Sequence, residues 1–316
     1  MLSGYNKIRF MRTVAQNARL FCVQPNKQVA VDKALLSKLR KKTGYPMINC
    51  KKALVQFDND IKEAETWMRE QAQKEGWEKA GKLQDRPMSQ GLVGLIEDDT
   101  SVTVVEVNCE TDFVAKNENF QALVSQIVKA CHKHTPQSDN GKVLLDNNEI
   151  NSMKDEDVTL SDKVALLVGK LGENIAIRRA ASISKDSSTV VSSFVHASGP
   201  PMVKDGIKLG KFAAITKVEI PDVDGIAKEL CQHIVGMNPT EMGEWRPKPI
   251  DKKELKKKKK EKEENKSRPE DKVEQRLLDQ EFLLDSQFTV RSYLHDNAPK
   301  VEDFVRMECG EDLGED

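Results

Sequence analysis

The sequence predicts an α+β protein in which a small three-helix domain precedes a larger core of antiparallel sheets and helices. Apolar residues recur at helical spacing between residues 32 and 72. From residue 92 onward, β-branched runs separated by polar turns are typical of strands. A strand pair accompanied by a helix occurs twice there, so we expect two similar subdomains, residues 90–160 and 161–246.

The first 31 residues have the composition of a mitochondrial transit peptide. Their basic residues are Lys7, Arg9, Arg12, Arg19 and Lys27, and no acidic residue precedes Asp32. Apolar residues are spread among these and do not form the continuous apolar segment of a secretory signal. The alternative is a disordered basic tail. We therefore leave residues 1–31 out of the predicted fold and expect the protein in the mitochondrial matrix.

Residues 32–72 contain three short helical patterns. The first includes Leu35, Leu36 and Leu39, and the breakers Gly44 and Pro46 end it. The apolar faces of the other two comprise Cys50, Ala53 and Leu54, then Ile61, Ala64, Trp67 and Met68. Asp60 and Glu63 can form the start of the third helix as a capping pair. A generic three-helix bundle is the alternative to any more specific fold.

The predicted core begins with a hairpin. Leu92–Ile96 and Val102–Val107 flank an acidic turn and read as antiparallel strands. A helix follows, because Phe120, Leu123, Val124, Ile127, Val128 and Cys131 fall on one helical face. A polar connection from His132 to Ser161 is expected to close this subdomain.

The second subdomain is predicted to begin with a helix over Asp162–Leu171. The strands Ile175–Ala180, Val190–Ala197 and Phe212–Ile220 follow, and then a helix over Asp224–Val235. Residues 247–276 form a charged linker with almost no apolar side chains. Residues 277–316 then complete the core, with a helix near Thr289–His295 and a last strand over Val301–Glu308.

Composition excludes several classes of function. The formal net charge is -1, whereas a nucleic-acid-binding domain is usually strongly basic. No apolar run reaches the roughly 18 residues that a membrane-spanning helix needs. The 6 cysteines include no Cys-x-x-Cys pair, which favours free buried thiols in a reducing compartment over a zinc site. No glycine-rich phosphate loop or nucleophile motif occurs, so we expect neither nucleotide binding, nor a metal or cofactor, nor enzyme activity.

The segment Asn108–Asn117 reads Asn-Cys-Glu-Thr-Asp-Phe-Val-Ala-Lys-Asn and joins a predicted strand to a predicted helix. Short loops that follow strands commonly carry binding residues. The simpler interpretation is that Thr111 or Asp112 caps the helix and that Phe113 belongs to the core. A second distinctive segment, Lys170–Arg179, reads Lys-Leu-Gly-Glu-Asn-Ile-Ala-Ile-Arg-Arg, with Gly172 placed to end a helix.

Both segments resemble signatures of the elongation factor Ts family, the nucleotide exchange factors of elongation factor Tu. Lys41–Gly44 and Cys50–Leu54 also match the first domain of that family, which has a ubiquitin-associated-like three-helix fold. The resemblance extends from Val31 to about Glu311. Unlike bacterial members, this chain has no long coiled-coil insertion, and Ala197 stands where the family has glycine after its histidine.

The resemblance implies roles for particular residues. Asp112 and Phe113 would form a wedge against the G domain of elongation factor Tu and disrupt its Mg²⁺ site. Leu171 and Gly172 would contact another helix of that domain, supported by His196, while Lys51 would touch it from the first domain. The expected partner is therefore mitochondrial elongation factor Tu, without direct nucleotide binding, a membrane or a specific nucleic acid.

Two other functions remain open at this point. The three-helix domain could belong to an adaptor that binds ubiquitin or nascent chains. The lysines of the charged linker could instead make the protein a ribosome-binding accessory factor, although the nearby acidic residues offset their charge.

Overall fold

A computed structural model of the chain describes residues 31–43, 45, 47–83, 85–135, 141–219, 225–245, 274–297 and 300–314. The expected transit peptide, except Val31, lies outside the described residues, as does the charged linker up to residue 273. The chain divides into two compact units, Met1–Met68 and Arg69–Asp316.

The N-terminal unit consists of α1 (Lys33–Thr43), α2 (Met47–Gln56) and the first turns of α3 (Ile61–Leu83). Its core comprises Leu39, Cys50, Ala53, Leu54, Ala64 and Met68. Asp60 starts α3 by accepting hydrogen bonds from the backbone N–H groups of Lys62 and Glu63 at 2.7 and 3.0 Å. All three expected helices are present, whereas the ubiquitin-associated-like fold stays a prediction.

Helix α3 runs past the boundary that the sequence predicted at residue 72. Its second half packs closely on α7 (Leu160–Leu171) within the larger unit. A Cβ added to Gly76 would lie 1.9 Å from the carbonyl oxygen of Ala165, so only glycine permits this approach. The helix therefore continues because its later turns have a surface to bury.

The larger unit contains a six-stranded sheet with strand order β3-β6-β2-β1-β9-β8. The predicted hairpin is confirmed as β1 (Gln90–Glu97) and β2 (Ser101–Cys109). Further strands are β3 (Lys142–Leu145), β6 (Ile175–Ser184), β8 (Met202–Lys204) and β9 (Ile207–Gly210). The predicted polar connection after His132 was too simple, because it contains β3, α6 (Asn147–Ser152), β4 (Lys154–Asp155) and β5 (Val158–Thr159).

A second, three-stranded sheet has the order β11-β10-β7. Its strands are β7 (Thr189–His196), β10 (Phe212–Glu219) and β11 (Val301–Glu308), all three predicted within a few residues. The expected division of the core at residues 160 and 161 does not follow the sheets. Strand β6 lies beyond that boundary but pairs along its length with β2, because β-branched and small residues of both strands share one core.

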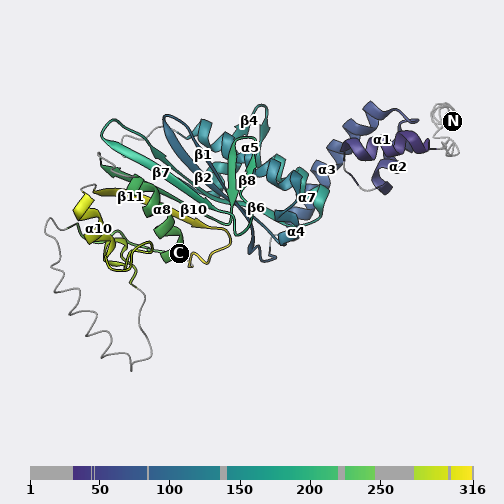
Figure 1. Ribbon diagram of the computed structural model, residues 1–316. Coiled ribbons are helices and arrows are strands. Elements are labelled where there is room, and N and C mark those ends of the chain that lie inside the picture. Colours follow the sequence, from purple (N-terminus) through teal and green to yellow (C-terminus); the bar gives the residue numbers. More distant parts are fainter. Residues whose placement is uncertain are drawn as a thin grey trace, which may run out of the picture. The chain divides into compact units, whose positions relative to one another are not determined.

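The larger unit is built in layers, as Figure 1 shows. Helices α5 (Glu118–His134) and α7 cover one face of the six-stranded sheet, with Phe120 and Ile127 fully buried there. The other face packs on the three-stranded sheet through residues such as Val104, Ile215 and Met307. Helix α8 (Ile226–Met237) and the segment around η2 (Leu277–Asp279) and α10 (Val290–Asn297) cover the outer face of the smaller sheet.

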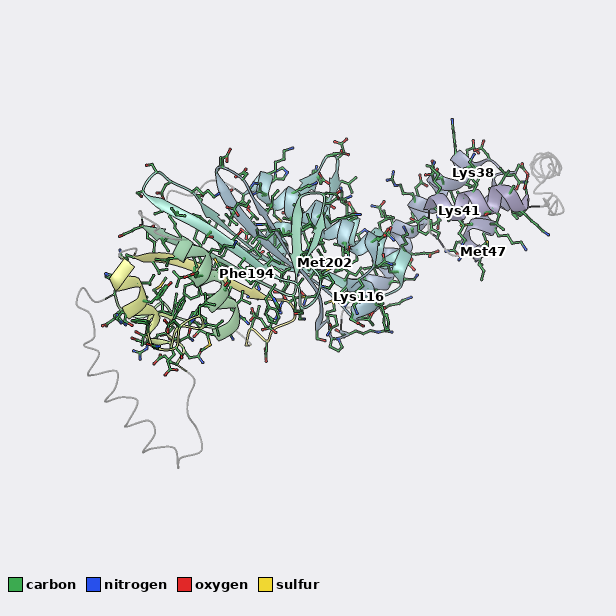
Figure 2. The ribbon with its side chains drawn as sticks, viewed as in Figure 1. Lys38, Lys41, Met47, Lys116, Phe194 and Met202 are labelled. Carbon is green, nitrogen blue, oxygen red and sulfur yellow. The ribbon has the colours of Figure 1, made fainter. Side chains whose placement is uncertain are left out.

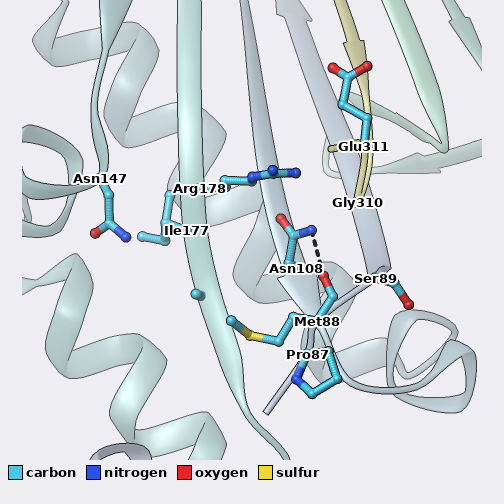
Figure 3. Close-up of a pocket in the computed structure, with 10 residues that line it drawn as sticks. Pro87, Met88, Ser89, Asn108, Asn147, Ile177, Arg178, Gly310 and Glu311 are labelled. Carbon is cyan, nitrogen blue, oxygen red and sulfur yellow. Dashed lines mark hydrogen bonds between the residues drawn. The ribbon is translucent and has the colours of Figure 1, made fainter. Parts of the chain in front are cut away.

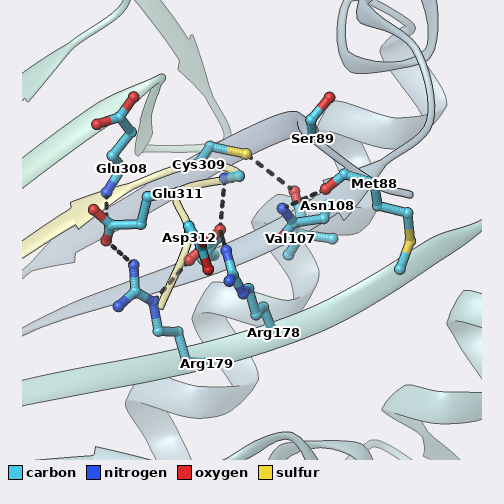
Figure 4. A network of polar contacts seen from close by, with 12 residues as sticks. Met88, Ser89, Val107, Asn108, Arg178, Arg179, Glu308, Cys309, Glu311 and Asp312 are labelled. Carbon is cyan, nitrogen blue, oxygen red and sulfur yellow. Dashed lines mark hydrogen bonds and ion pairs between the residues drawn. The ribbon is translucent and has the colours of Figure 1, made fainter. Parts of the chain in front are cut away.

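A buried polar network joins the two sheets (Figure 4). A β-bulge leaves Arg178 without a partner on β2, so that Arg178 and Arg179 both reach the carboxylate of Glu106, at 3.1 and 2.7 Å. Glu106 is completely buried and also accepts a hydrogen bond from the N–H of Gly310, which follows β11, at 2.8 Å. Arg179 pairs in addition with Glu311. The pairing compensates the cost of burying this carboxylate.

The cysteines behave as the composition suggested. Cys50, Cys109, Cys131, Cys231 and Cys309 are buried free thiols, while Cys22 lies outside the described residues. Burial raises the pKa of Cys109, Cys131 and Cys309 to about 12. At that pKa the nucleophilic thiolate is scarce at neutral pH, so these cysteines serve as small core residues.

Candidate functional site

The turn after β2 carries an exposed aromatic ring on an ordered mount. Thr111 caps the single-turn helix α4 (Asp112–Ala115), because its hydroxyl accepts the N–H of Val114 at 3.3 Å. Phe113 is 80% exposed, whereas its neighbours Val114 and Ala115 are buried. Thr111 is therefore a helix cap, but of α4, whereas the predicted helix α5 (Glu118–His134) is capped by Asn117. The interpretation of Phe113 as a core residue is wrong.

The turn after α7 has the conformation that its glycine predicts. Gly172 has φ 80° and ψ 12°, in the left-handed region, and its N–H closes the helix on the carbonyl of Val168 at 2.8 Å. Gly172 is exposed, and the preceding Leu171 is half-buried against the helical core. Gly172 and part of Leu171 are therefore accessible to solvent.

Two sets of hydrogen bonds join these two turns, one between side chains and one from backbone to side chain. The hydroxyl of Thr111 lies 3.0 Å from each carboxylate oxygen of Glu173. In return, the backbone N–H of Asn174 donates to Glu110 at 2.7 Å. The strands that lead to the turns are neighbours, with Cys109 opposite Ile175. The structure thus brings Asp112, Phe113, Leu171 and Gly172 together at one end of the six-stranded sheet.

Charged side chains flank this surface. Lys116 donates to the carboxylate of Asp112 at 2.7 Å, and this hydrogen bond lowers the pKa of Asp112. Lys170, at the end of α7, donates to the side-chain oxygen of Asn119 at 3.1 Å, and burial lowers the pKa of its amine. Asp112 therefore remains ionised at neutral pH, but its exposure makes the pairing with Lys116 weak.

The two other residues from the sequence-based prediction lie elsewhere. His196 is exposed at the end of β7, on the three-stranded sheet, with its ring centroid 5.9 Å from that of Phe212. Lys51 belongs to the N-terminal unit. It is exposed on α2, one helical turn from Met47 and Ile48, which are 42% and 68% exposed. Both residues are accessible, and their roles stay predictions.

A hairpin that was not predicted from the sequence, β8 and β9, lies beside the Phe113 turn. Gln121 of α5 contacts both the carbonyl of Lys116, at 3.4 Å, and the sulfur of Met202 on β8, at 3.9 Å. Lys116 and Met202 are labelled in Figure 2. Next to Met202, Val203 is 67% exposed. The missed signal was Asp205-Gly206, which has φ values of 52° and 84° and forms the two-residue turn between β8 and β9.

A depression of about 390 Å³ lies near the ends of β2 and β6 (Figure 3). Its lining includes Met88, Asn108, Arg178 and Glu311. The amide nitrogen of Asn108 donates to the carbonyl of Met88 at 3.1 Å, while its buried side-chain oxygen has no partner. That the chain binds no nucleotide directly stays a prediction.

The described part of the chain lacks two kinds of feature. Within it, no group of three or more His, Cys, Asp or Glu side chains is arranged to hold a metal ion. None of its helices combines the length and the apolar character needed to cross a membrane.

Known proteins resemble this chain over most of its length. The family profile described as "Elongation factor TS" matches residues 110–311, and the profile "Elongation factor Ts, mitochondrial, N-terminal" matches residues 18–78. Proteins named "Elongation factor Ts, mitochondrial" are 40% identical in Salmo salar, 44% in Branchiostoma floridae and 37% in Homo sapiens. These alignments cover 90%, 89% and 89% of this chain and 87%, 90% and 84% of the respective relatives.

Proposed function

The chain belongs to the elongation factor Ts family, and on that premise we propose that it promotes GDP release from mitochondrial elongation factor Tu during translation elongation. The protein would act in the mitochondrial matrix, as the names of its relatives and the composition of residues 1–31 suggest. Exchange of this kind requires binding but no covalent chemistry. The proposed function is therefore consistent with a sequence that shows no nucleophile motif.

The observation that carries the proposal is the exposure of Phe113 on a capped turn. A phenylalanine that is 80% exposed contributes little to the core, yet α4 holds its backbone in place. Burying such a ring in a partner would contribute roughly 1.5–3 kcal/mol. The proposed wedge is therefore Asp112 and Phe113, with the ring entering the G domain of the partner near its bound Mg²⁺.

One ring is not sufficient for exchange. Accelerating GDP release about a thousandfold requires ~4 kcal/mol of destabilisation, more than one phenylalanine supplies. Leu171 and Gly172, on the turn joined to that of Phe113, are proposed to contact a further helix of the G domain. His196 and Lys51 would add contacts from the three-stranded sheet and from the N-terminal unit. We assign the remaining energy to these contacts jointly.

The proposed mechanism acts on the metal ion of the partner. Mg²⁺ requires nearly ideal octahedral geometry, so a small shift of the groups around it weakens its coordination. Loss of the ion would then loosen the contacts to the β-phosphate of GDP. Because binding free energies are reciprocal, GDP with Mg²⁺ must weaken the binding of this factor by the same ratio.

The test is GDP release from mitochondrial elongation factor Tu loaded with fluorescent GDP. The full chain without residues 1–31 should accelerate release at catalytic concentrations. Titrating GDP and Mg²⁺ into the preformed complex should dissociate it, and GDP without Mg²⁺ should compete less well. A complex that persists at saturating GDP and Mg²⁺ would show that the two ligands are not coupled, and the chain would then be a scaffold.

A further inference from the structure

The two turns of the candidate site exchange carboxylate contacts. Glu173, on the turn after α7, accepts the hydroxyl of Thr111 at 3.0 Å. Glu110, on the turn after β2, accepts the backbone N–H of Asn174 at 2.7 Å. Each turn therefore supplies the acceptor for a donor on the other, across 62 and 64 positions of the chain. We call this pair of contacts the carboxylate clamp.

We propose that Glu173 and Glu110 are positioning residues that hold the Phe113 turn and the Leu171–Gly172 turn as one preformed binding surface. This inference rests on the proposed function, because it assumes that both turns contact the same partner. Neither glutamate needs to touch the partner. Their effect would pass through Thr111 and Asn174 to the residues that do.

The clamp stabilises a helix that is too short to be stable alone. A helix of four residues, such as α4, makes too few backbone hydrogen bonds to offset the cost of its nucleation. The Thr111 hydroxyl donates to Glu173 while it accepts from the N–H of Val114. Glu173 thus fixes the rotamer in which Thr111 caps the helix, and the cap fixes the backbone that carries Phe113.

The other half of the clamp is anchored in the core. Asn174 is 4% exposed, and its side-chain amide donates to the carbonyl of Leu83 at 2.9 Å. Glu110 also pairs with Arg86 at 3.3 Å. Both contacts connect the clamp to the end of α3 and the segment that follows. The Phe113 turn is therefore attached, through Glu110, to the buried residue Asn174.

Preformed turns should affect affinity more than the maximal rate. A partner that binds disordered turns must order them, and this cost weakens binding. Glu173→Ala should therefore raise the factor concentration that gives half-maximal GDP release by about tenfold, equivalent to about 1.4 kcal/mol. The rate at saturation should remain close to that of the wild type, because Phe113 is unchanged. Glu78→Ala, which removes an exposed carboxylate from α3, is the matched control and should behave as the wild type.

Variants of Thr111 test whether the clamp acts through the hydroxyl. Thr111→Val should weaken binding at least as much as Glu173→Ala, because it removes the hydrogen bond from Val114 as well as the contact with Glu173. Thr111→Ser, which keeps the hydroxyl, should retain most of the affinity. The double variant Thr111→Val with Glu173→Ala should be no worse than Thr111→Val alone, because both changes break the same contact. If the double variant raised the half-maximal concentration by the product of the two single effects, the substitutions would act independently. That result would overturn the proposal.

Hydrogen–deuterium exchange of the free protein supplies a readout that needs no partner. The amides of residues 111–116 should exchange faster in Glu173→Ala than in Glu78→Ala. If Glu173→Ala fails to fold, Glu173→Gln keeps one acceptor oxygen and should show a smaller change in the same direction. If the wild type accelerates GDP release and Glu173→Ala equals it in both measurements, the clamp has no positioning role. If the wild type itself does not accelerate release, the proposed function fails instead.

Discussion

Phe113 and Phe282 lie in similar local settings but serve the protein in opposite ways. Each lies in a short stretch beside a helix, Phe113 in α4 before α5 and Phe282 between η2 and α10. Phe113 is 80% exposed, whereas Phe282 is 1% exposed. The ring of Phe282 stacks on Tyr293, with centroids 4.2 Å apart. The comparison shows that the fold uses one ring for its own core and leaves the other available to a partner.

The two segments are also held by different means. The Phe113 turn depends on the carboxylate clamp and on the helix cap. The Phe282 segment is held by His233, which is completely buried on α8. One ring nitrogen of His233 accepts the N–H of Leu283 at 3.1 Å, and the other donates to Gln280 at 2.9 Å. Since a backbone N–H can only donate, the first nitrogen carries no proton and the imidazole is neutral.

The largest expected effect on stability comes from Phe282→Ala. Truncating a buried phenylalanine leaves a cavity and removes the stacking on Tyr293, so unfolding should become easier by about 3–5 kcal/mol. Urea denaturation monitored by circular dichroism measures this change. GDP release per folded molecule should stay near the wild-type value at low temperature. A loss below about 1 kcal/mol would mean that the segment is not part of the cooperative core.

A second prediction concerns the pH dependence that His233 imposes. Burial lowers the pKa of His233 to about 4 from its ordinary 6.5. The unfolded chain therefore binds a proton at His233 more readily than the folded chain does. The contribution of neutral His233 to the free energy of unfolding is fully present above pH 6.5 and is lost as the pH drops toward 4. A difference of this size corresponds to about 3 kcal/mol. Urea denaturation at several pH values should show a steeper loss for the wild type than for His233→Gln, and equal slopes would contradict the assignment.

The third prediction separates the two phenylalanines by function. Phe113→Ala should slow stimulated GDP release well over tenfold, because the proposed wedge loses its ring. The free energy of unfolding should change by less than about 0.5 kcal/mol, since an exposed side chain contributes little to the core. Phe282→Ala is the control, because it should lower the free energy of unfolding strongly while GDP release per folded molecule stays near the wild-type value. A large loss of thermal stability in Phe113→Ala would place its ring in the core in solution.

The sequence predicted the segments on which these comparisons rest, but not every state of their side chains. The cap at Thr111 and the helix end at Gly172 depend on local chemistry, which neighbouring residues determine. The exposure of Phe113 could not be predicted from the sequence. Phe113 lies in α4, a separate single turn, so the apolar periodicity of α5 says nothing about the direction of its side chain. The contacts of Glu173 with Thr111 and of Arg178 with Glu106 join distant positions, and the second requires a β-bulge that no residue pattern announced.

The smallest expected effect concerns Gly172, on the turn that is hydrogen-bonded to the Phe113 turn. It tests whether the backbone conformation of Gly172, rather than packing, stabilises this turn. A Cβ added to Gly172 would meet no atom within 4 Å, so a substitution there creates no clash. The left-handed φ of 80° nevertheless costs an ordinary residue about 1 kcal/mol. Gly172→Ala should therefore lower the free energy of unfolding by about 1 kcal/mol, and Gly172→Asn by less, because asparagine tolerates this conformation better. Urea denaturation of both variants measures the difference.

Equal stability of the alanine, asparagine and wild-type proteins would show that the turn can leave the left-handed conformation freely. In that case the carboxylate clamp alone would have to hold the turn that lies beside Phe113.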